Sequence, residues 1–273
     1  MKTNKLTNQQ VCSDRQSFDA TTFDGYAALY EEIFTWPYRS ELEIPMLRTL
    51  LGDVSGKAVL DFGCGPGTFT RWLKHLGARQ VVGYDISAGM LSYARNREET
   101  EQAGLTYTSD ISSYAQQFDI VLAVYVMPYA PDRLTLTHMV RDMADVLKPG
   151  GRLITLPLNP AFHPDPDYYR PYGIRLLGQQ ERLDDGSTVT LHLCHPPYDI
   201  QIEACYWTHL TLEDTLRAEG IGAIEWVTYD AVQSKCSSFL LPYAQCPHAA
   251  IITGEKVRRV DRKRADDASE HTA

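Results

Sequence analysis

The sequence has no apolar segment long enough to cross a bilayer, because its longest apolar run, Ile120 to Met127, falls far short of a membrane span. The N-terminal residues contain no apolar stretch typical of a signal peptide. Basic residues are scarce, with 26 lysines and arginines against 35 aspartates and glutamates. An acidic chain lacks the basic face that phosphate backbones require. We therefore expect no membrane anchor and no nucleic-acid partner.

Cysteines are few and scattered along the chain. The six of them, at positions 12, 64, 194, 205, 236 and 246, form no C-x-x-C pair and no dense framework. This distribution predicts reduced thiols in a cytoplasmic protein rather than a disulfide scaffold. With 44% hydrophobic and 22% charged residues, the 273-residue chain has the balance of an ordinary globular protein with a substantial core.

Strand and helix patterns alternate from Lys57 to Leu156. The continuous apolar run from Phe118 to Val126 is typical of a strand buried on both faces, and Asp132 is placed to cap the helix after it. The alternation predicts an α/β fold with a doubly wound, mostly parallel, seven-stranded sheet of Rossmann-like type. The expected strands are 58–61, 81–85, 105–108, 118–126, 152–156, 221–229 and 249–253, and the expected helices are 68–76, 88–103, 132–147 and one that opens at Thr211 in capping-box style.

We expect a single domain over residues 18–256, between mobile tails at 1–17 and 257–273. Its first part, 18–51, is rich in aromatics and predicts a helical cap. The residues behind this prediction are Tyr26, Tyr30 and Ile33 at helical spacing, with Pro37 and Pro45 expected to break the helix into pieces.

Residues 157–208 depart from the strand–helix alternation and are rich in proline and aromatics. The stretches 188–194 and 200–208 alternate between apolar and polar residues, which predicts an antiparallel pair. We expect this insertion to be a lid that covers the sheet and lines a substrate pocket.

A glycine-rich turn follows the first expected strand, in the segment Asp61-Phe-Gly-Cys-Gly-Pro-Gly67. Glycines let the backbone approach a ligand, and the helix that follows offers unpaired N–H groups. A dinucleotide site of the G-x-G-x-x-G type would place a third glycine where Thr68 stands. Asp61 suits an ammonium group better than a pyrophosphate. Further acids, Asp85 and Asp110, end the next two strands, where carboxylates can accept from ribose hydroxyls and from an adenine amine.

Five segments, in this order and spacing, resemble the class I S-adenosylmethionine-dependent methyltransferases. They are Asp61-Phe-Gly-Cys-Gly-Pro-Gly67, Gly83-Tyr-Asp-Ile-Ser-Ala-Gly-Met-Leu91, Asp110-Ile111, Phe118-Asp-Ile-Val121 and Leu147-Lys-Pro-Gly-Gly151. The resemblance covers residues 57–156 and implies S-adenosylmethionine as the cofactor, with the turn at its methionine moiety and Asp85 at its ribose. We further expect Tyr26 and Tyr30 to close over the cofactor and Arg39 to lie near its carboxylate. The expected cofactor contacts are Tyr30, Arg39, Asp61, Gly63, Cys64, Gly65, Asp85, Ile86, Met90, Asp110, Ile111 and Ala123.

The segment after the fourth strand, Leu122-Ala-Val-Tyr-Val-Met-Pro-Tyr-Ala130, is similar to small-molecule natural-product methyltransferases of the toxoflavin N-methylating and teleocidin C-methylating types. It has neither the Asn/Asp-Pro-Pro-Tyr sequence of nucleic-acid amino methylation nor the metal ligands of catechol-type enzymes. The resemblance therefore implies a small bulky, apolar or heteroaromatic substrate and no metal. The histidines and cysteines near 192–209 form no tetrahedral ligand pattern that would overturn this expectation.

We expect the substrate to contact Tyr125, Met127, Pro128, Tyr129, Phe162 and His192. The candidate general base is His163, just past the fifth strand, because the pKa of histidine lies near neutrality. Tyr26 and Tyr198 complete the catalytic set. Whether carbon, nitrogen or oxygen is methylated stays open, and so does the alternative that His163 only bonds to backbone.

Two rival functions use the same fold. One is an NAD-type oxidoreductase, which Thr68 and Asp61 disfavour. The other is an enzyme that binds the cofactor but catalyses a rearrangement or cyclisation. The aromatics of the N-terminal helix also suggest the hypothesis of a homo-oligomer in which this helix lies over a neighbour's site.

Overall fold

The computed structural model describes residues 20–178, 180 and 182–257. The tails expected at 1–17 and 257–273 lie outside these residues, apart from Val257.

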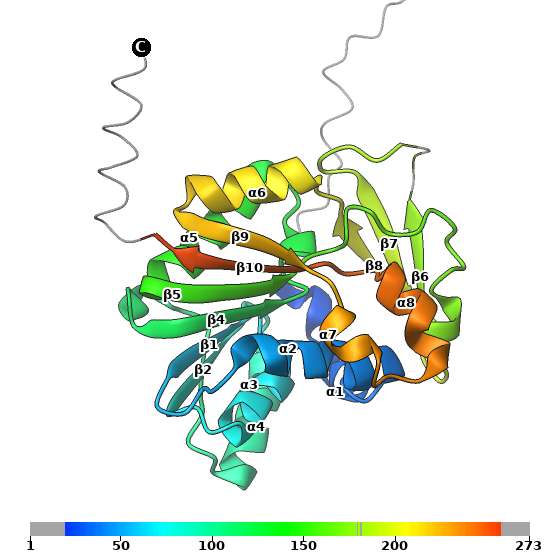
Figure 1. The fold of residues 1–273 in the computed structure, drawn as a ribbon. Coiled ribbons are helices and arrows are strands. Elements are labelled where there is room, and N and C mark those ends of the chain that lie inside the picture. The colour runs from blue at the N-terminus through cyan, green and yellow to red at the C-terminus, as the bar shows by residue number, and fades with distance from the viewer. Residues whose placement is uncertain (1–19, 179, 181, 258–273) are drawn as a thin grey trace, which may run out of the picture.

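Seven strands of the described chain form one twisted sheet in the order β3-β2-β1-β4-β5-β10-β9 (Figure 1). The first five pair in parallel, while β10 runs antiparallel to both β5 and β9. The strands are β1 (Ala58–Phe62), β2 (Gln80–Tyr84), β3 (Thr106–Thr108), β4 (Phe118–Val124), β5 (Leu147–Leu156), β9 (Ile221–Val227) and β10 (Ile251–Lys256). The expected doubly wound, mostly parallel sheet is confirmed.

Helices cover both faces of this sheet (Figure 1). One core cluster joins the sheet to α5 and α6, and the other joins it to α2, α3 and α4. The helices are α1 (Ala27–Ile33), α2 (Ile44–Leu51), α3 (Thr68–His75), α4 (Ala88–Glu101), α5 (Arg133–Val146), α6 (His209–Ala218), α7 (Asp230–Gln233) and α8 (Leu241–Gln245).

The helix caps explain where two of these helices begin. The Asp132 carboxylate accepts a hydrogen bond from the Thr135 N–H at 2.8 Å, as expected for the cap of α5. Helix α6 opens earlier than expected, because Thr208 and not Thr211 is its cap and accepts from the Thr211 N–H at 3.3 Å.

The N-terminal cap, residues 20–51, is less broken than its prolines predict. Residues 37–51 are helical throughout, with a π-helical turn at Arg39–Glu43 that runs directly into α2. Pro45 is the second residue of α2, directly after the π-helical turn, and the helix continues through it. The expectation that Pro45 breaks the helix is therefore wrong.

The lid, residues 157–208, contains a three-stranded antiparallel sheet beyond the ends of the parallel strands (Figure 1). Its strands are β6 (Ile174–Gly178), β7 (Thr188–Leu193) and β8 (Ile200–Cys205), in that order. The sequence predicts the last two as a pair but not β6, whose few residues follow a run of prolines without a clear alternation.

Candidate active site

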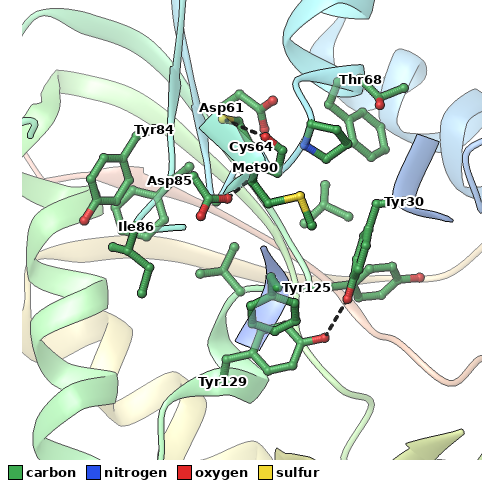
Figure 2. Close-up of a pocket in the computed structure, with 18 of the residues that line it drawn as sticks. Tyr30, Asp61, Cys64, Thr68, Tyr84, Asp85, Ile86, Met90, Tyr125 and Tyr129 are labelled. Atoms are coloured by element: carbon green, nitrogen blue, oxygen red, sulfur yellow. Dashed lines mark hydrogen bonds between the residues drawn. The ribbon is translucent and has the colours of Figure 1, made fainter. Parts of the chain in front are cut away.

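A cavity of about 350 Å³ opens at the carboxyl ends of β1, β2 and β4 (Figure 2). Ligands of open α/β sheets bind at this edge. Its wall combines the glycine turn, the residues after β2 and β4, the N-terminal cap and one face of α5. The lining residues are Phe23, Tyr30, Phe34, Arg39, Asp61, Phe62, Gly63, Cys64, Gly65, Pro66, Thr68, Phe69, Tyr84, Asp85, Ile86, Met90, Val124, Tyr125, Val126, Tyr129, Thr135, His138, Met139 and Asp142.

The turn between β1 and α3 needs glycine for steric reasons. Gly63 has φ +75°, and a Cβ there would lie 2.4 Å from Cγ2 of Val126. Gly67 has φ +81°, and its Cβ would lie 2.4 Å from the Tyr107 hydroxyl. Left-handed backbone of this kind strains any other residue. The turn therefore forms a backbone cradle that side chains would fill.

Asp85 closes the cradle from the end of β2. Its carboxylate accepts from the Gly65 N–H at 2.7 Å and from the Ser87 N–H at 2.9 Å. Burial raises the pKa of Asp85, and these backbone N–H groups oppose the rise. The carboxylate lines the cavity and has lone pairs left for two hydroxyls, so it fits a ribose diol.

Asp61 lies beneath the turn, only 2% exposed, and accepts from the Thr70 hydroxyl at 2.6 Å. Burial raises its pKa to about 7, and Thr70 opposes this rise. A carboxyl in this position gains from an ammonium group in the cavity, which would favour its ionised form. The site thus fits the amino end of the methionine moiety.

Aromatic rings face the turn from the opposite side of the cavity (Figure 2). The Tyr30 hydroxyl of α1 lies 3.5 Å from the Tyr129 hydroxyl, and the Tyr125 ring stands beside them. Tyr125 has φ +60°, a strained conformation for a residue other than glycine that marks functional sites. Rings of this kind attract a sulfonium by cation–π interaction.

A buried ion pair supports the aromatic wall. The π-helical turn places Arg39 Nε 3.1 Å from Glu43 Oε2, and the Arg39 guanidinium lies 4.6 Å from the centre of the Tyr125 ring. The Tyr125 hydroxyl donates to the Glu43 carboxylate. Burial raises the pKa of Glu43, while Arg39 and the hydroxyls bonded to the carboxylate oppose the rise. Arg39 lines the cavity and keeps a positive charge there for a carboxylate ligand.

A second cavity of about 40 Å³ lies on the other side of this wall. It shares Tyr30, Arg39, Tyr125 and Tyr129 with the first cavity. Residues of the cap, the lid, the segment after β4 and the segment before β10 form the rest. Its further lining residues are Ile33, Tyr38, Pro128, Leu158, Ile174, Leu176, Leu191, Leu193, Ala204, His248 and Ala249.

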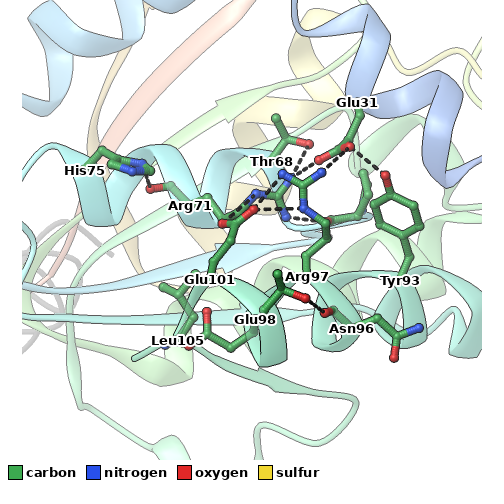
Figure 3. Close-up of polar contacts among 12 residues, drawn as sticks. Glu31, Thr68, Arg71, His75, Tyr93, Asn96, Arg97, Glu98, Glu101 and Leu105 are labelled. Atoms are coloured by element: carbon green, nitrogen blue, oxygen red, sulfur yellow. Dashed lines mark hydrogen bonds and ion pairs between the residues drawn. The ribbon is translucent and has the colours of Figure 1, made fainter. Parts of the chain in front are cut away.

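Polar contacts hold α1 against helices α3 and α4 (Figure 3). Glu31 of α1 pairs with the buried Arg71 of α3 and accepts from the Tyr93 hydroxyl of α4 at 2.6 Å. Arg97 of α4 lies 3.4 Å from the same carboxylate. These contacts position Tyr30, which directly precedes Glu31, over the cavity.

Two more contacts fasten the edges of the cap. Asp24 Oδ1 accepts from the Ser87 hydroxyl at 2.6 Å and from the Gly89 N–H at 2.9 Å, at the first turn of α4. On the lid side, the Tyr198 hydroxyl donates to Glu32 at 2.6 Å. The cap is thus bound both to the sheet helices and to the lid.

The structure brings most of the expected cofactor residues together. Those that line the first cavity are Tyr30, Arg39, Asp61, Gly63, Cys64, Gly65, Asp85, Ile86 and Met90, joined by the expected substrate residues Tyr125 and Tyr129. Asp110 and Ile111 do not line it. Asp110 is exposed, and its carboxylate instead accepts from the Ser112 N–H at 2.8 Å in the turn after β3.

Ala123, Met127 and His192 line neither cavity. Ala123 and His192 lie on strands, where neighbouring residues face opposite ways, and Met127 begins a short helical turn after β4. Ala123 belongs to the core cluster with α5, and its neighbour Val124 lines the cavity. Met127 is fully buried in the same cluster, while Pro128 lines the second cavity.

His192 points away from the second cavity, which its neighbours Leu191 and Leu193 line. Its Nε2 lies 2.5 Å from Asp199 Oδ1 on the outer side of the lid. Phe162 also stays outside both cavities, and its ring packs near that of Tyr206 at a centroid distance of 6.3 Å.

The three expected catalytic residues do not line either cavity. The His163 ring stacks on Tyr168 at a centroid distance of 4.0 Å, and its Nδ1 accepts from the Asp165 N–H at 3.1 Å. Tyr26 precedes α1 as its cap residue, and Tyr198 joins the lid to the cap. This placement separates all three from the cofactor side.

Sequence reasoning missed the contributions of α5 and of the segment before β10. Thr135, His138, Met139 and Asp142 lie along one face of α5, at a helical spacing that also fits an ordinary core stripe. His248 follows no motif, and only the fold brings it to the lid. Phe34 and Phe69 carried a weak signal as aromatics near the cap and the turn, and their rings meet at 5.1 Å.

Within the described residues, no cluster of three or more His, Cys, Asp or Glu side chains is arranged to hold a metal ion. Across the same part of the chain, every helix is too short or too polar for a bilayer-spanning segment.

Comparison with known proteins gives the geometry a family context. Residues 59–151 match the family model described as a methyltransferase domain. The ubiquinone biosynthesis O-methyltransferase of Coxiella burnetii is 33% identical over 113 residues, which cover 40% of this chain and 47% of that protein. The chain therefore matches about half the length of this curated relative.

Solved structures extend the similarity to the whole fold. An S-adenosylmethionine-dependent methyltransferase from Mesorhizobium loti superposes with a TM-score of 0.55 at 20% identity, over 82% of this chain and 99% of that one. The 4+2 cyclase SpnF superposes with a TM-score of 0.54 at 15% identity, over 86% and 93%. At these identities the likeness concerns the fold. The resemblance of residues 57–156 to S-adenosylmethionine-dependent methyltransferases, noted from the motifs, is confirmed.

Proposed function

We propose that this chain, which carries a class I S-adenosylmethionine-dependent methyltransferase domain, transfers the cofactor's methyl group to a small, bulky, apolar or heteroaromatic metabolite. The observation that carries the proposal is the cradle at the glycine turn, closed by Asp85 and faced by aromatic rings. It offers each part of S-adenosylmethionine a partner of matching chemistry.

In this proposal, the cofactor extends along the first cavity from Arg39 to α5. Arg39 holds the carboxylate of the methionine moiety, Asp61 its ammonium group and Asp85 the ribose hydroxyls. Ile86 and Met90 then pack on the adenine. Because α5 lines the far end of the cavity, Asp142 is better placed than the exposed Asp110 to accept from the adenine amine.

S-adenosylmethionine supplies an electrophilic methyl group on its sulfonium when bound. The residues of this chain have to align an acceptor with that methyl group and exclude water, which can supply about 7–11 kcal/mol in favourable cases. The wall of Tyr30, Tyr125 and Tyr129 stands between the two cavities and sets the place of transfer. The second cavity, lined by the lid, receives the acceptor.

A second candidate function is a rearrangement or cyclisation on a bound cofactor. The likeness of the fold to that of a 4+2 cyclase favours it. The same aromatic wall would then shape a reacting chain without methyl loss. An NAD-type oxidoreductase gains no support from the site, because Asp61 places a carboxyl under the turn where a pyrophosphate would lie.

Calorimetric titration with S-adenosylhomocysteine and with NAD tests the proposal directly. We expect stoichiometric binding of S-adenosylhomocysteine and no binding of NAD. The opposite result would overturn the methyltransferase assignment. If S-adenosylmethionine binds and is recovered unchanged after incubation with acceptors that the protein also binds, the cyclase alternative is favoured.

A further inference from the structure

The second cavity contains a polar group that the proposed cofactor site does not use. His248 is 4% exposed and lines this cavity, just before β10 and next to the carboxyl end of β5. The polar side chains that line it with His248 are Arg39 and several tyrosines, which it shares with the first cavity apart from Tyr38. Its Nδ1 lies 2.7 Å from the Tyr243 hydroxyl. Among the described residues, no side chain or backbone group makes a hydrogen bond with its Nε2.

The Tyr243 contact determines which nitrogen carries the proton. Tyr243 also donates to Glu43 Oε1 at 3.2 Å, and a carboxylate paired with Arg39 has no proton to give. The contact of the Tyr243 hydroxyl with Nδ1 is the shorter of the two, but we assign its single proton to Glu43, since bonds to an ionised acceptor are the stronger ones. Nδ1 of His248 must then donate to the Tyr243 oxygen. This leaves the lone pair of Nε2 as the acceptor in the cavity.

The ring of His248 is fixed in this orientation. The rings of Tyr38 and Tyr125 lie at centroid distances of 5.4 and 5.3 Å, and that of Tyr169 at 6.0 Å. Burial lowers the pKa of His248 to about 3, and the positive charge of Arg39 adds to this effect. The resting imidazole is neutral, as an acceptor must be.

We propose that Nε2 of His248 accepts a hydrogen bond from a hydroxyl on the methyl acceptor, and that the acceptor is an apolar molecule with a phenolic or enolic hydroxyl. This inference rests on the proposed methyl transfer and names its substrate class. An amine can react with its own lone pair, whereas a hydroxyl has to lose a proton. The apolar lid residues accommodate the body of the acceptor, and a cavity of about 40 Å³ accommodates its reacting end.

The proton and charge balance is simple. The carbon–sulfur bond breaks with its electron pair left on sulfur, and a lone pair of the acceptor oxygen forms the new carbon–oxygen bond. The hydroxyl proton passes to Nε2 and leaves to solvent after product release. One positive charge thus moves from sulfonium to imidazolium. Glu43 accepts from Tyr243 on the Nδ1 side of the ring, while burial and Arg39 oppose the charge.

Two substitutions of His248 test the roles of Nδ1 and Nε2 separately. His248→Asn places an amide where Nδ1 contacts Tyr243 but removes the acceptor at the cavity. His248→Gln extends an amide oxygen toward the position of Nε2 but cannot take up a proton. The probes are 4-propylphenol, which can donate its hydroxyl hydrogen to Nε2, and 4-propylanisole, in which a methyl group replaces that hydrogen; both are titrated into protein saturated with S-adenosylhomocysteine.

We expect the wild type to bind 4-propylphenol about tenfold more tightly than 4-propylanisole in NMR titrations, the effect of about one hydrogen bond. His248→Asn should lose this preference and His248→Gln should keep most of it. Turnover of 4-propylphenol with S-adenosylmethionine should fall on the order of 10²-fold in both variants, the lower end of the contribution of a general base, because burial lowers the pKa of His248. Equal affinities in the wild type, or a preference retained by His248→Asn, would overturn the inference.

The tautomer gives a readout that does not depend on any acceptor. Two-bond ¹H–¹⁵N correlation of histidine-labelled protein should show His248 protonated at Nδ1, and Tyr243→Phe should disturb this state. A proton at Nε2 in the wild type would contradict the proposal. The affinity of each variant for S-adenosylhomocysteine reports whether the cofactor side is intact. If the wild type itself fails to bind it, the proposed function fails. If it binds and the phenol preference is absent, only the present inference fails.

Discussion

The two cavities are built in different ways from the same chain. The first is built around a backbone turn, the cradle at 63–67, which is fixed by left-handed glycines and closed by Asp85 through N–H groups. The second is made of side chains from the cap, the lid and the segment before β10, far apart in sequence. The first kind of cavity suits a ligand that is common to a family, and the second kind suits a ligand that varies. A backbone cradle tolerates little change, whereas a side-chain pocket can be rebuilt by substitution.

The largest effect is expected from breaking the Arg39–Glu43 ion pair, which supports the aromatic wall shared by the two cavities. Glu43→Leu leaves Arg39 buried without its partner, which typically costs about 3–5 kcal/mol. We expect that loss in the free energy of unfolding, measured by urea denaturation. The double variant Arg39→Met with Glu43→Leu should recover much of it, because an apolar pair is often as stable as a buried ion pair. Full stability of the single variant would show that the pair contributes nothing.

Asp85→Ala tests the first cavity, with its backbone cradle, separately from the second. It removes the carboxylate proposed to hold two ribose hydroxyls, and charge-assisted hydrogen bonds of about 1.5–3 kcal/mol each predict a loss of more than about 100-fold in affinity for S-adenosylhomocysteine. Calorimetry measures the loss. Asp110→Ala is the matched control, because this exposed residue also ends a strand and should change the affinity by less than about threefold. Equal losses in both variants would restore Asp110 as a cofactor ligand.

Gly89→Ala tests the contact between Asp24 of the cap and the first turn of α4. A Cβ at Gly89 would lie 2.6 Å from the backbone of Asp24, so the first turn of the cap has to move. Overpacking of this kind costs about 1–3 kcal/mol, and we expect S-adenosylhomocysteine to dissociate about tenfold faster in stopped-flow measurements. Gly25→Ala meets no atom within 4 Å and serves as the control. An unchanged rate would mean that the cap does not retain the cofactor.

The smallest expected effect is a pH dependence on the backbone side. The pKa of Asp61 is raised to about 7 by burial, so the carboxyl is mostly neutral below that pH and ionised above it. A cofactor ammonium favours the ionised form, and affinity for S-adenosylhomocysteine should therefore rise between pH 6 and 8, by less than about tenfold. Asp61→Asn should flatten this profile. A decrease with pH in the wild type would contradict the proposed ammonium partner.

The backbone side could be predicted from sequence, and the side-chain pocket mostly could not. Asp61, the glycines and Asp85 lie within one strand–turn–helix–strand unit, where local spacing dictates geometry. Glu43, Tyr243 and His248 meet only because the cap and the segment before β10 pack together. No spacing rule relates residues about two hundred positions apart.

The misplaced residues have a simpler cause. The strand at 118–124 and the strand at 188–193 were both located correctly, yet Ala123 and His192 point away from the site. A shift of one residue reverses every side chain of a strand. Sequence alone identified the strand but not which of its two faces meets the ligand, because the lid buries apolar residues toward the cavity and the sheet buries both faces.

The π-helical turn at Arg39–Glu43 determines the direction in which the residues before α2 point. Each residue of a helix advances the chain by about 100°, so the wider turn shifts the rotational phase of everything before it relative to α2. Deleting one residue from this turn would restore a regular helix and rotate the preceding residues away from the sheet. Arg39 would then face another direction. A single inserted residue is thus enough to decide which side of an otherwise ordinary helix takes part in the active site.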